Sequence, residues 1–219
     1  ALPSPCPPGL LGGRFVVEPY QYALAYSKTA GVVLNWFRRE FAGDMSLAEL
    51  DKLAAKVPIG SRGVSMLPHF DGMVSPDPDP RMRGIFANVA IQHARADLYR
   101  AILEALSFSL RENLEFLKEN GARIKTIRSI GGGAKSDLWL QMKADVVGLP
   151  VEKPKVTEAA VMGAAMLAAV GQGEYGFLQE SSEALYRKER VFRPNAARHR
   201  AYEEPYRRYR MLRETGGRL

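Results

Sequence analysis

Cysteine is almost absent from this chain of 219 residues, because Cys6 is the only one. A single cysteine excludes an intrachain disulfide and any zinc site built from several cysteines. Long apolar runs are also lacking, since none approaches the roughly 20 residues that a membrane-spanning helix needs. Residues 1–9 are rich in proline and have neither the basic start nor the apolar core of a secretory signal. These absences predict a soluble, cytoplasmic protein without a membrane partner.

The remaining composition is that of an ordinary globular protein. Hydrophobic residues make up 46% of the chain and charged residues 25%, which is too apolar for a disordered chain and too irregular for a fibrous one. The length fits one domain of generous size, or two small ones at most. No internal repeat is visible.

The positive charge is confined to the C-terminal end of the chain. The net charge is +7, and residues 187–219 hold 11 Lys or Arg against 4 Asp or Glu, so the preceding part is neutral. A basic segment could attract the phosphate backbone of a nucleic acid. It could equally be a helical segment whose long basic side chains lie over the domain surface. No nucleic-acid motif accompanies the charge, so we favour the second interpretation.

Hydrophobic periodicity and turn residues predict an alternation of strands and helices, which indicates an α/β domain. A capping box of Ser46 and Glu49 should start one helix, and Thr157 should cap another, whose Gly163 face is thin enough for close packing. The helix over 92–119 has two apolar faces and should be central. Helices are expected at 23–41, 46–58, 92–119, 137–147 and 158–170, near Glu183 and at 198–213, and strands at 14–18, 64–67, 124–130 and Val151.

The segment from Ile127 to Asp137 is the most informative for chemistry. A strand ends at Ile130, three glycines follow at 131–133, and a helix begins after Ser136, a suitable N-cap. Glycines permit positive φ and leave backbone N–H groups uncovered, so that a flat or anionic ligand can lie against them. This arrangement favours a nucleotide site, and a tight turn needed only for packing is the alternative.

Two sharper phosphate-binding motifs do not fit these residues. Ala134 separates Gly133 from Lys135 and the upstream glycine is missing, which excludes a P-loop. Ser136 stands where the dinucleotide fingerprint needs its third glycine. Asp137 in the first helical turn would repel a phosphate placed there, so the adenosine end of a nucleotide is expected at this turn.

The same segment resembles a known family. Residues 131–151, GGGAKSDLWLQMKADVVGLPV, resemble the ATP-binding segment of the FGGY carbohydrate kinases, most of all the xylulokinase-type branch. Three further stretches resemble the family in the family's order and extend the likeness over about 15–180. They are MLPHFDG at 66–72 with DPRMRG at 79–84, GIFANV at 84–89 continuing to DLYRAILE at 97–104, and EAAVMGAA at 158–165.

The resemblance implies a fold and a reaction. FGGY kinases have two actin-like (ribonuclease H-like) lobes, each a mixed sheet flanked by helices, and transfer the γ-phosphoryl group of ATP, with Mg, to a ketose or polyol hydroxyl in the cleft between them. Residues 1–219 resemble the C-terminal, ATP-binding lobe alone, with 187–219 as its basic helical end. The family's catalytic aspartate and most of its sugar site lie upstream of the matching part. We therefore assign no catalytic residue and no metal ligand, and we expect the chain alone to be inactive. The sugar site would be shared with a missing N-terminal lobe, and a pentulose such as xylulose is the favoured sugar.

The resemblance also implies which residues bind ATP or ADP. Gly132, Gly133 and Ala134 should line the adenosine pocket, and Ser136 or Asp137 should reach the base or the ribose. Asn88 stands where the family has a glycine near the phosphates, and could narrow the site or supply a hydrogen bond.

Other residues keep two interpretations or a structural one. Lys135 could meet phosphate or point into water, and Glu158 could orient the glycine turn or merely benefit from a helix dipole. Trp36 and Trp139 are expected in the core, and Asp145 on a helix surface.

Two alternative functions remain from the sequence. The chain could be a nucleotide-binding or dimerisation module without catalysis, for which a homodimer is the natural assembly. It could also be a nucleic-acid-binding domain that acts through its basic C-terminal segment, although the missing motif argues against this.

Overall fold

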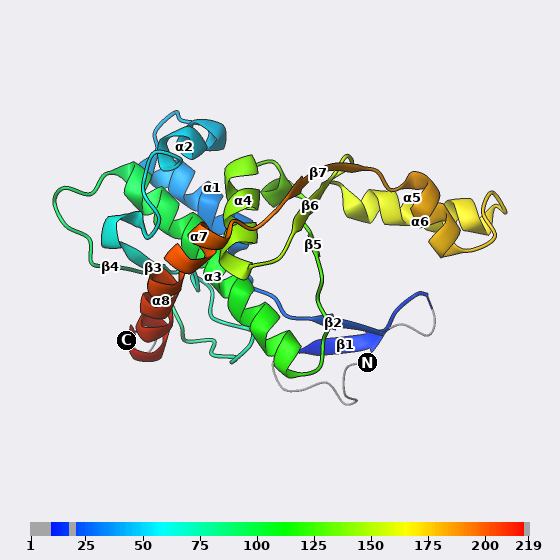
Figure 1. Cartoon of the computed structure of the whole chain (residues 1–219), viewed down its shortest axis with the longest axis horizontal. Coiled ribbons are helices and arrows are strands. Elements are labelled where there is room, and N and C mark those ends of the chain that lie inside the picture. Colours follow the sequence, from blue (N-terminus) through cyan, green and yellow to red (C-terminus); the bar gives the residue numbers. More distant parts are fainter. Residues whose placement is uncertain (1–9, 18–20, 217–219) are drawn as a thin grey trace.

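A computed structural model gives the fold of residues 10–17 and 21–216 (Figure 1). Residues 1–9, which include Cys6, residues 18–20, which include Glu18 of the expected strand, and residues 217–219 lie outside the described residues. The helices are α1 (Ala30–Phe41), α2 (Leu47–Ala54), α3 (Arg95–Glu119), α4 (Asp137–Val147), α5 (Ala159–Gly171), α6 (Leu178–Leu185), α7 (Ala196–Ala201) and α8 (Glu203–Gly216), with the short 3-10 helices η1 (Ser61–Gly63) and η2 (Gly132–Ala134). The strands are β1 (Leu11–Arg14), β2 (Gln21–Leu24), β3 (Ser65–Leu67), β4 (Ile85–Ala87), β5 (Ile127–Arg128), β6 (Val151–Pro154) and β7 (Lys188–Phe192).

Helix α3 lies at the centre of the molecule, and α1, α2, α4 and α8 pack around it (Figure 1). Every side chain from Tyr99 to Ser109 is buried, which confirms the prediction of a helix covered on two sides. The helix begins at Arg95 instead of Gln92, because the turn before it is closed by its own bonds. Ala90 N donates to Nδ1 of His93 (2.8 Å), and Ala94 N donates to Oδ2 of Asp97 (2.9 Å).

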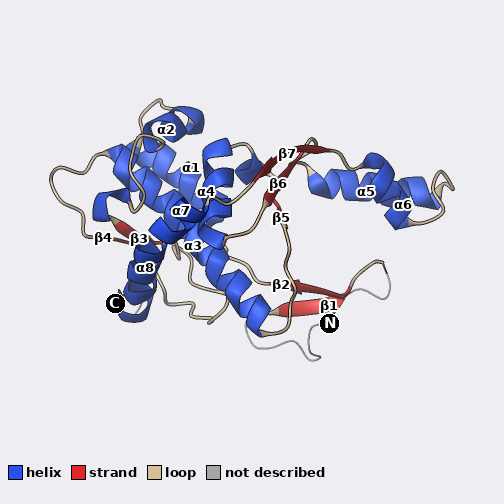
Figure 2. Ribbon diagram, viewed as in Figure 1, coloured by secondary structure: helices blue, strands red, loops and turns tan. Residues whose placement is uncertain are grey.

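The strands form three small sheets among the helices (Figure 2). β1 pairs with β2 and β3 with β4, both antiparallel. In the third sheet β6 is central, parallel to β5 and antiparallel to β7. Leu140 and Ala144 of α4 pack against Val151 and Phe192 of that sheet. The α/β class, with a mixed sheet flanked by helices, is thereby confirmed.

Several expected boundaries are wrong. The strand expected at 14–18 ends at Arg14, and residues 21–24 pair with it instead of starting a helix, so α1 begins only at Ala30. β7 was missed because its sequence, KERVF, is mostly charged and exposed, as an edge strand tolerates. Thr157 does not cap α5: Glu158 is the N-cap residue, and the Thr157 carbonyl instead accepts from Gly131 N (2.8 Å).

The capping predictions for two other helices are confirmed. Oγ of Ser46 accepts from Glu49 N, and the Glu49 carboxylate accepts from Ser46 N (2.8 Å), so that both partners of the capping box are present at α2. Oγ of Ser136 accepts from Trp139 N (3.1 Å) at α4. Both helices therefore begin at residues that the sequence identifies.

Asp145 is not on a helix surface, and this prediction is wrong. Its side chain is 2% exposed, and Oδ1 accepts from Gln141 Nε2 (2.9 Å) and from Asn195 N (2.8 Å). The carboxylate ties α4 to the turn that starts α7. Trp139 lies in the core as predicted, whereas Trp36 is only partly buried against it, beside Phe70.

Helices α5 and α6 extend from the body as an arm, at the right of Figure 1. The sequence of α5, AAVMGAAMLAAVG, is almost wholly apolar, yet none of its residues is buried among the described residues. Val161 is 71% exposed and Leu167 48%. A Cβ on Gly163 would meet no atom within 4 Å, so the close packing expected for this face has no partner in the described part of the chain. None of the described helices is long and apolar enough to cross a bilayer.

The basic segment packs onto the body through its aromatic side chains. Tyr206 and Tyr209 of α8 each lie with ring centroids 5.6 Å from that of Phe108. Their hydroxyls donate to Glu115 and Glu112 of α3. Five of the basic side chains also form ion pairs: Lys188 with Glu152, Arg190 with Asp137, Arg198 with Asp145, Arg208 with Glu204, and Arg213 with Asp77 and Glu112. This arrangement supports the interpretation that the basic side chains lie over the domain surface.

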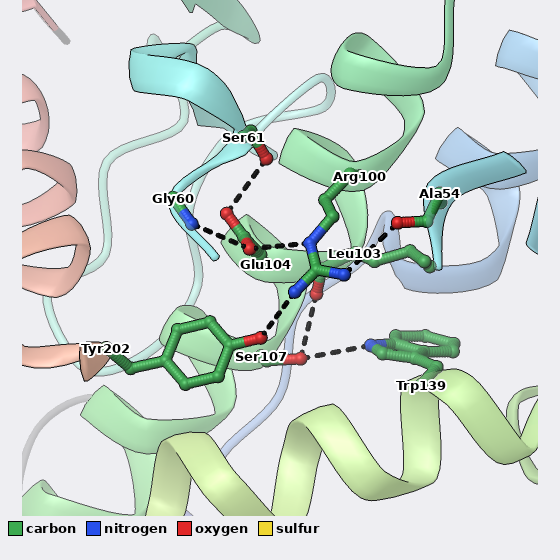
Figure 3. Close-up of polar contacts among 9 residues, drawn as sticks. All are labelled: Ala54, Gly60, Ser61, Arg100, Leu103, Glu104, Ser107, Trp139 and Tyr202. Atoms are coloured by element: carbon green, nitrogen blue, oxygen red, sulfur yellow. Dashed lines mark hydrogen bonds and ion pairs between the residues drawn. The ribbon is translucent and has the colours of Figure 1, made fainter. Parts of the chain in front are cut away.

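A buried ion pair on α3 joins the surrounding elements (Figure 3). Nε of Arg100 donates to Oε1 of Glu104 (2.9 Å), and the two side chains are only 8% and 3% exposed. The guanidinium also donates to the Ala54 carbonyl (3.1 Å) and to the Tyr202 hydroxyl (3.0 Å). Glu104 accepts from Gly60 N (3.1 Å) and Ser61 Oγ (2.9 Å). One pair thus holds α2, the loop before β3, and the start of the C-terminal helices.

Replacing Arg100 by Met should destabilise the fold by about 3–5 kcal/mol, because it leaves the Glu104 carboxylate buried without a cation. Burial already raises the pKa of Glu104 against the opposing effect of Arg100. In Arg100→Met the folded carboxyl therefore binds its proton more tightly than the unfolded one, and the variant should lose stability as the pH rises above the unfolded pKa.

The double variant Arg100→Met/Glu104→Gln is the matched control, because the uncharged amide can still accept from Gly60 N through its oxygen and donate to Oγ of Ser61 through its nitrogen. We expect urea unfolding near pH 7 to show it more stable than the single variant and without the added pH dependence. A double variant that is no more stable than Arg100→Met would contradict this account of the cost.

Candidate functional site

The glycine turn joins β5 to α4 and is fixed at both ends. Gly131 has φ 67° and ψ −158°, a conformation that glycine adopts without a Cβ clash, and its N–H is held by Thr157. Gly132 to Ala134 form the single turn η2, and Ser136 then caps α4. The turn is thus a rigid connection between sheet and helix.

A cleft of about 610 Å³ lies against this turn, and we call it the glycine cleft. The turn contributes Gly132, Gly133, Lys135 and Ser136, and α4 contributes Trp139. The opposite side comes from elements far away in the sequence. Its residues include Gly31, Leu34 and Asn35 of α1, Leu47 and Asp51 of α2, and Tyr99 of α3. A largely apolar cleft of this size with a few polar groups is typical of a small-molecule site.

The structure brings together three of the six residues that the sequence analysis assigned to the nucleotide. Gly132, Gly133 and Ser136 line the glycine cleft. Ala134 is fully buried behind the turn and has no surface in it. Asp137 is not a lining residue, and its carboxylate binds Arg190 (2.8 Å) and Lys153 (3.3 Å). The predicted contact of Asp137 with base or ribose therefore has no support in this geometry.

Asn88 lies outside the residues that line the glycine cleft. Its φ is 59°, in the left-handed region where asparagine is among the few tolerated non-glycine residues, so it can occupy a position that suits glycine. Its Nδ2 donates to the Gly63 carbonyl (3.0 Å). The side chain thus supplies a hydrogen bond within the protein, to the last residue of η1.

The residues that α1 and α2 contribute to the glycine cleft were not expected from the sequence. Asn35 and Asp51 lie more than 80 residues before the glycine turn in the sequence, and they reach it because both helices pack on α3. No local signal singled out Asn35 or Asp51, because α1 and α2 carry several other polar residues, Glu49 and Lys52 of α2 among them.

The two cleft glycines differ in what surrounds them. A Cβ on Gly133 would come within 3.0 Å of the Trp139 ring and 3.4 Å of Nζ of Lys143, whereas a Cβ on Gly132 would meet no atom within 4 Å. Gly133 is thus needed for packing, and Gly132 leaves open space toward the cleft. Trp139 is held from behind, since its Nε1 donates to Oγ of Ser107 (3.1 Å; Figure 3).

Lys143 adds a desolvated positive charge behind the turn. Its Nζ lies 3.8 Å from the Trp139 ring centroid and 3.3 Å from Oγ of Ser129. Burial lowers the pKa of Lys143 to about 8. Among the described residues, no group of three or more His, Cys, Asp or Glu side chains is placed to hold a metal ion, so a magnesium ion here would take its ligands mostly from a nucleotide's phosphates and from water.

Comparison with known proteins agrees with this architecture. Residues 7–172 match the family described as "FGGY family of carbohydrate kinases, C-terminal domain". The chain is 36% identical over 191 residues to the xylulose kinase of Staphylococcus epidermidis and 37% identical over 191 residues to that of Bacillus subtilis. In both cases the likeness covers 87% of this chain and 38% of the relative, so the chain spans about two fifths of their length.

A solved structure shows the same likeness in three dimensions. The xylulose kinase of Rhodospirillum rubrum superimposes with a TM-score of 0.80 at 30% identity, over 95% of this chain and 42% of that one. The fold of this chain is therefore that of the corresponding part of an actin-like kinase.

Replacing Lys143 by Met should stabilise the fold near pH 7 by about 1–3 kcal/mol. The reason is that burial of the Lys143 ammonium, which lowers its pKa to about 8, costs free energy in the native state. The Trp139 ring offsets part of this cost. The unfolded chain binds this proton up to its ordinary pKa of about 10.4, so the wild type gains stability as the pH rises between the two values. Urea midpoints near pH 7 and near pH 10 should show the advantage of the variant shrinking. An advantage that stays constant over this range would refute the assignment.

Proposed function

The chain belongs to the FGGY family of carbohydrate kinases, as a C-terminal domain of that family, and on this premise we propose that it is the ATP-binding lobe of a sugar kinase. The complete enzyme would transfer the γ-phosphoryl group of ATP to a hydroxyl of a ketose or polyol. The names of the relatives favour a pentulose such as xylulose. The observation that carries the proposal is the glycine cleft, because its open backbone floor and apolar walls suit a nucleoside.

The glycine cleft contains surfaces for both parts of a nucleoside. Leu34, Leu47 and the Trp139 ring are apolar and can cover the faces of a purine. Asn35, Asp51 and Ser136 supply polar atoms for its edges and for the ribose. Gly132 is exposed and a Cβ there would meet no atom within 4 Å, so the ligand can approach the backbone directly.

Phosphoryl transfer itself depends on positioning and on neutralising the phosphate charge. Lys135, exposed at the edge of the cleft, forms no ion pair among the described residues and is the available cation for phosphate. The base for the sugar hydroxyl, the sugar site and the remaining phosphate contacts are expected from the rest of the polypeptide. The chain alone should therefore bind nucleotide weakly and phosphorylate no sugar.

The exposed apolar arm supports a second part of the proposal, a lobe that the chain packs against. Beside α5, Phe15, Val16, Met166, Leu167 and Leu178 line a groove of about 480 Å³. Because apolar side chains in such number are stabilised by burial, this surface is suited to the remainder of a kinase whose relatives are more than twice as long. The same surface also supports the alternative of a dimerisation module, in which a second copy covers α5.

Gly132→Val should abolish the binding of ADP to the chain, because its branched side chain enters open space that the nucleoside would occupy. Gly171→Val is the matched control, since a Cβ there also meets no atom within 4 Å and neither glycine has a positive φ. Isothermal calorimetry with ADP measures both variants against the wild type. Equal affinity of Gly132→Val and wild type would remove the glycine turn from the site.

Leu167→Glu combined with Val161→Lys should reduce the self-association of the chain and its binding of a hydrophobic dye, because both side chains are exposed on α5. The same change in the two-lobe enzyme should weaken the contact between lobes and lower its activity. Analytical ultracentrifugation of the chain, together with an activity assay of the two-lobe enzyme, separates the alternatives. A discrete wild-type dimer that the substitutions dissociate, together with unchanged activity of the longer protein, would favour the dimerisation module.

A further inference from the structure

Asp51 is the one acidic side chain among the described residues that line the glycine cleft. It lies in the last turn of α2, and Oδ1 accepts from the Tyr99 hydroxyl (3.1 Å). No Lys or Arg of the described chain forms an ion pair with it. Burial raises the pKa of Asp51, while the hydroxyls of Ser136 and Tyr99 act to lower it.

A partly buried carboxylate without a cation is costly unless its oxygens accept hydrogen bonds. An ionised carboxylate has about four acceptor positions, and the hydroxyls of Tyr99 and Ser136 account for two of them. The remaining acceptor positions of the Asp51 carboxylate are available to a ligand in the cleft. A ligand that brings an N–H or O–H donor would relieve this cost, whereas a phosphate group would be repelled.

The two acids near the glycine turn therefore have different surroundings. Asp137 carries its negative charge between Arg190 and Lys153, outside the cleft lining. Asp51 lies inside the lining, forms no ion pair among the described residues, and is bonded by the hydroxyls of Tyr99 and Ser136. The acid that can orient a nucleotide in this cleft is the one on α2, although the sequence drew attention to the one on α4.

We propose that Asp51 is a specificity residue of the glycine cleft, and that its carboxylate accepts a hydrogen bond from a neutral donor of the nucleoside and keeps the phosphates away from α2. The donor is an exocyclic amine of the base or a ribose hydroxyl. This inference rests on the proposed nucleotide function. It explains how a cleft with a mostly apolar lining would select one orientation of a ligand that is polar at both ends.

Asp51→Asn tests the inference, because the amide has nearly the same shape but no charge and one acceptor oxygen fewer. We expect calorimetry to show ADP binding weakened by about tenfold to a hundredfold, the usual range for a hydrogen bond to a charged group. Purine riboside 5′-diphosphate, which lacks the amine, and 2′-deoxy-ADP and 3′-deoxy-ADP, which lack one hydroxyl each, identify the donor. The analogue without that donor should bind the wild type more weakly than ADP and should bind Asp51→Asn as well as it binds the wild type.

Two controls keep the result interpretable. Asp44→Asn removes the charge of an exposed aspartate just before α2 and should leave ADP binding unchanged. Tyr99→Phe removes the hydroxyl that donates to Asp51 and should retain the preference for ADP over the discriminating analogue, which separates loss of the carboxylate from loss of its hydrogen bond to Tyr99.

The outcomes separate this inference from the proposed function. If the wild type binds none of the nucleotides, the proposed function is wrong. If the wild type binds ADP, but Asp51→Asn binds ADP and all three analogues with unchanged affinity, or weakens all four by one common factor, then Asp51 has no part in selectivity and the inference alone is overturned.

Discussion

The buried ion pair of Arg100 and Glu104 is the interaction on which the other arrangements depend. Arg100 binds the carbonyl of Ala54 at the end of α2, and Glu104 binds the backbone that leaves α2 at Gly60. Asp51 stands three residues before Ala54, within the same short helix. The ion pair therefore sets where α2 ends, and through α2 it sets the position of Asp51, the one carboxylate among the described residues that line the glycine cleft. Because a buried pair is costly to break from one side, the cleft wall can shift only if α3 and α2 lose contact together.

The opposite wall is fixed by a different set of contacts. Trp139 is bonded through Ser107 to α3, and Gly133 lets the turn approach the Trp139 ring to a distance that a Cβ would not permit. These contacts fix the turn and α4 against α3. Both walls are fixed to the same central helix, α3, so the glycine cleft has a defined width before any ligand enters. A site that is already formed spends less of its binding free energy on ordering.

A feature could be predicted from the sequence when the residues that form it lie close together along the chain. The capping box of Ser46 and Glu49, the cap at Ser136 and the two-faced helix α3 depend on neighbours a few residues away, and all three predictions are confirmed. The resemblance carried by the glycine segment identified the family. Asp145 was placed wrongly because its partners, at Asn195 and Arg198, come from 50 residues further along the chain. The contribution of α2 to the cleft was missed for the same reason, since no local pattern relates Asp51 to Ser136.

The structure also accounts for the excess of positive charge near the C-terminal end, which composition alone did not explain. The segment that contains it packs with its tyrosines inward, and part of its charge neutralises carboxylates of the body, Asp137 among them. An unpaired aspartate in the first turn of α4 would oppose the approach of any phosphate to the glycine turn. Arg190 and Lys153 neutralise Asp137, so it no longer opposes a phosphate there, whereas Asp51 lies inside the cleft and forms no ion pair among the described residues. On the proposed function, the basic segment would thereby contribute to the electrostatic contrast that orients a nucleotide, and a separate polyanionic partner is not needed to account for its charge.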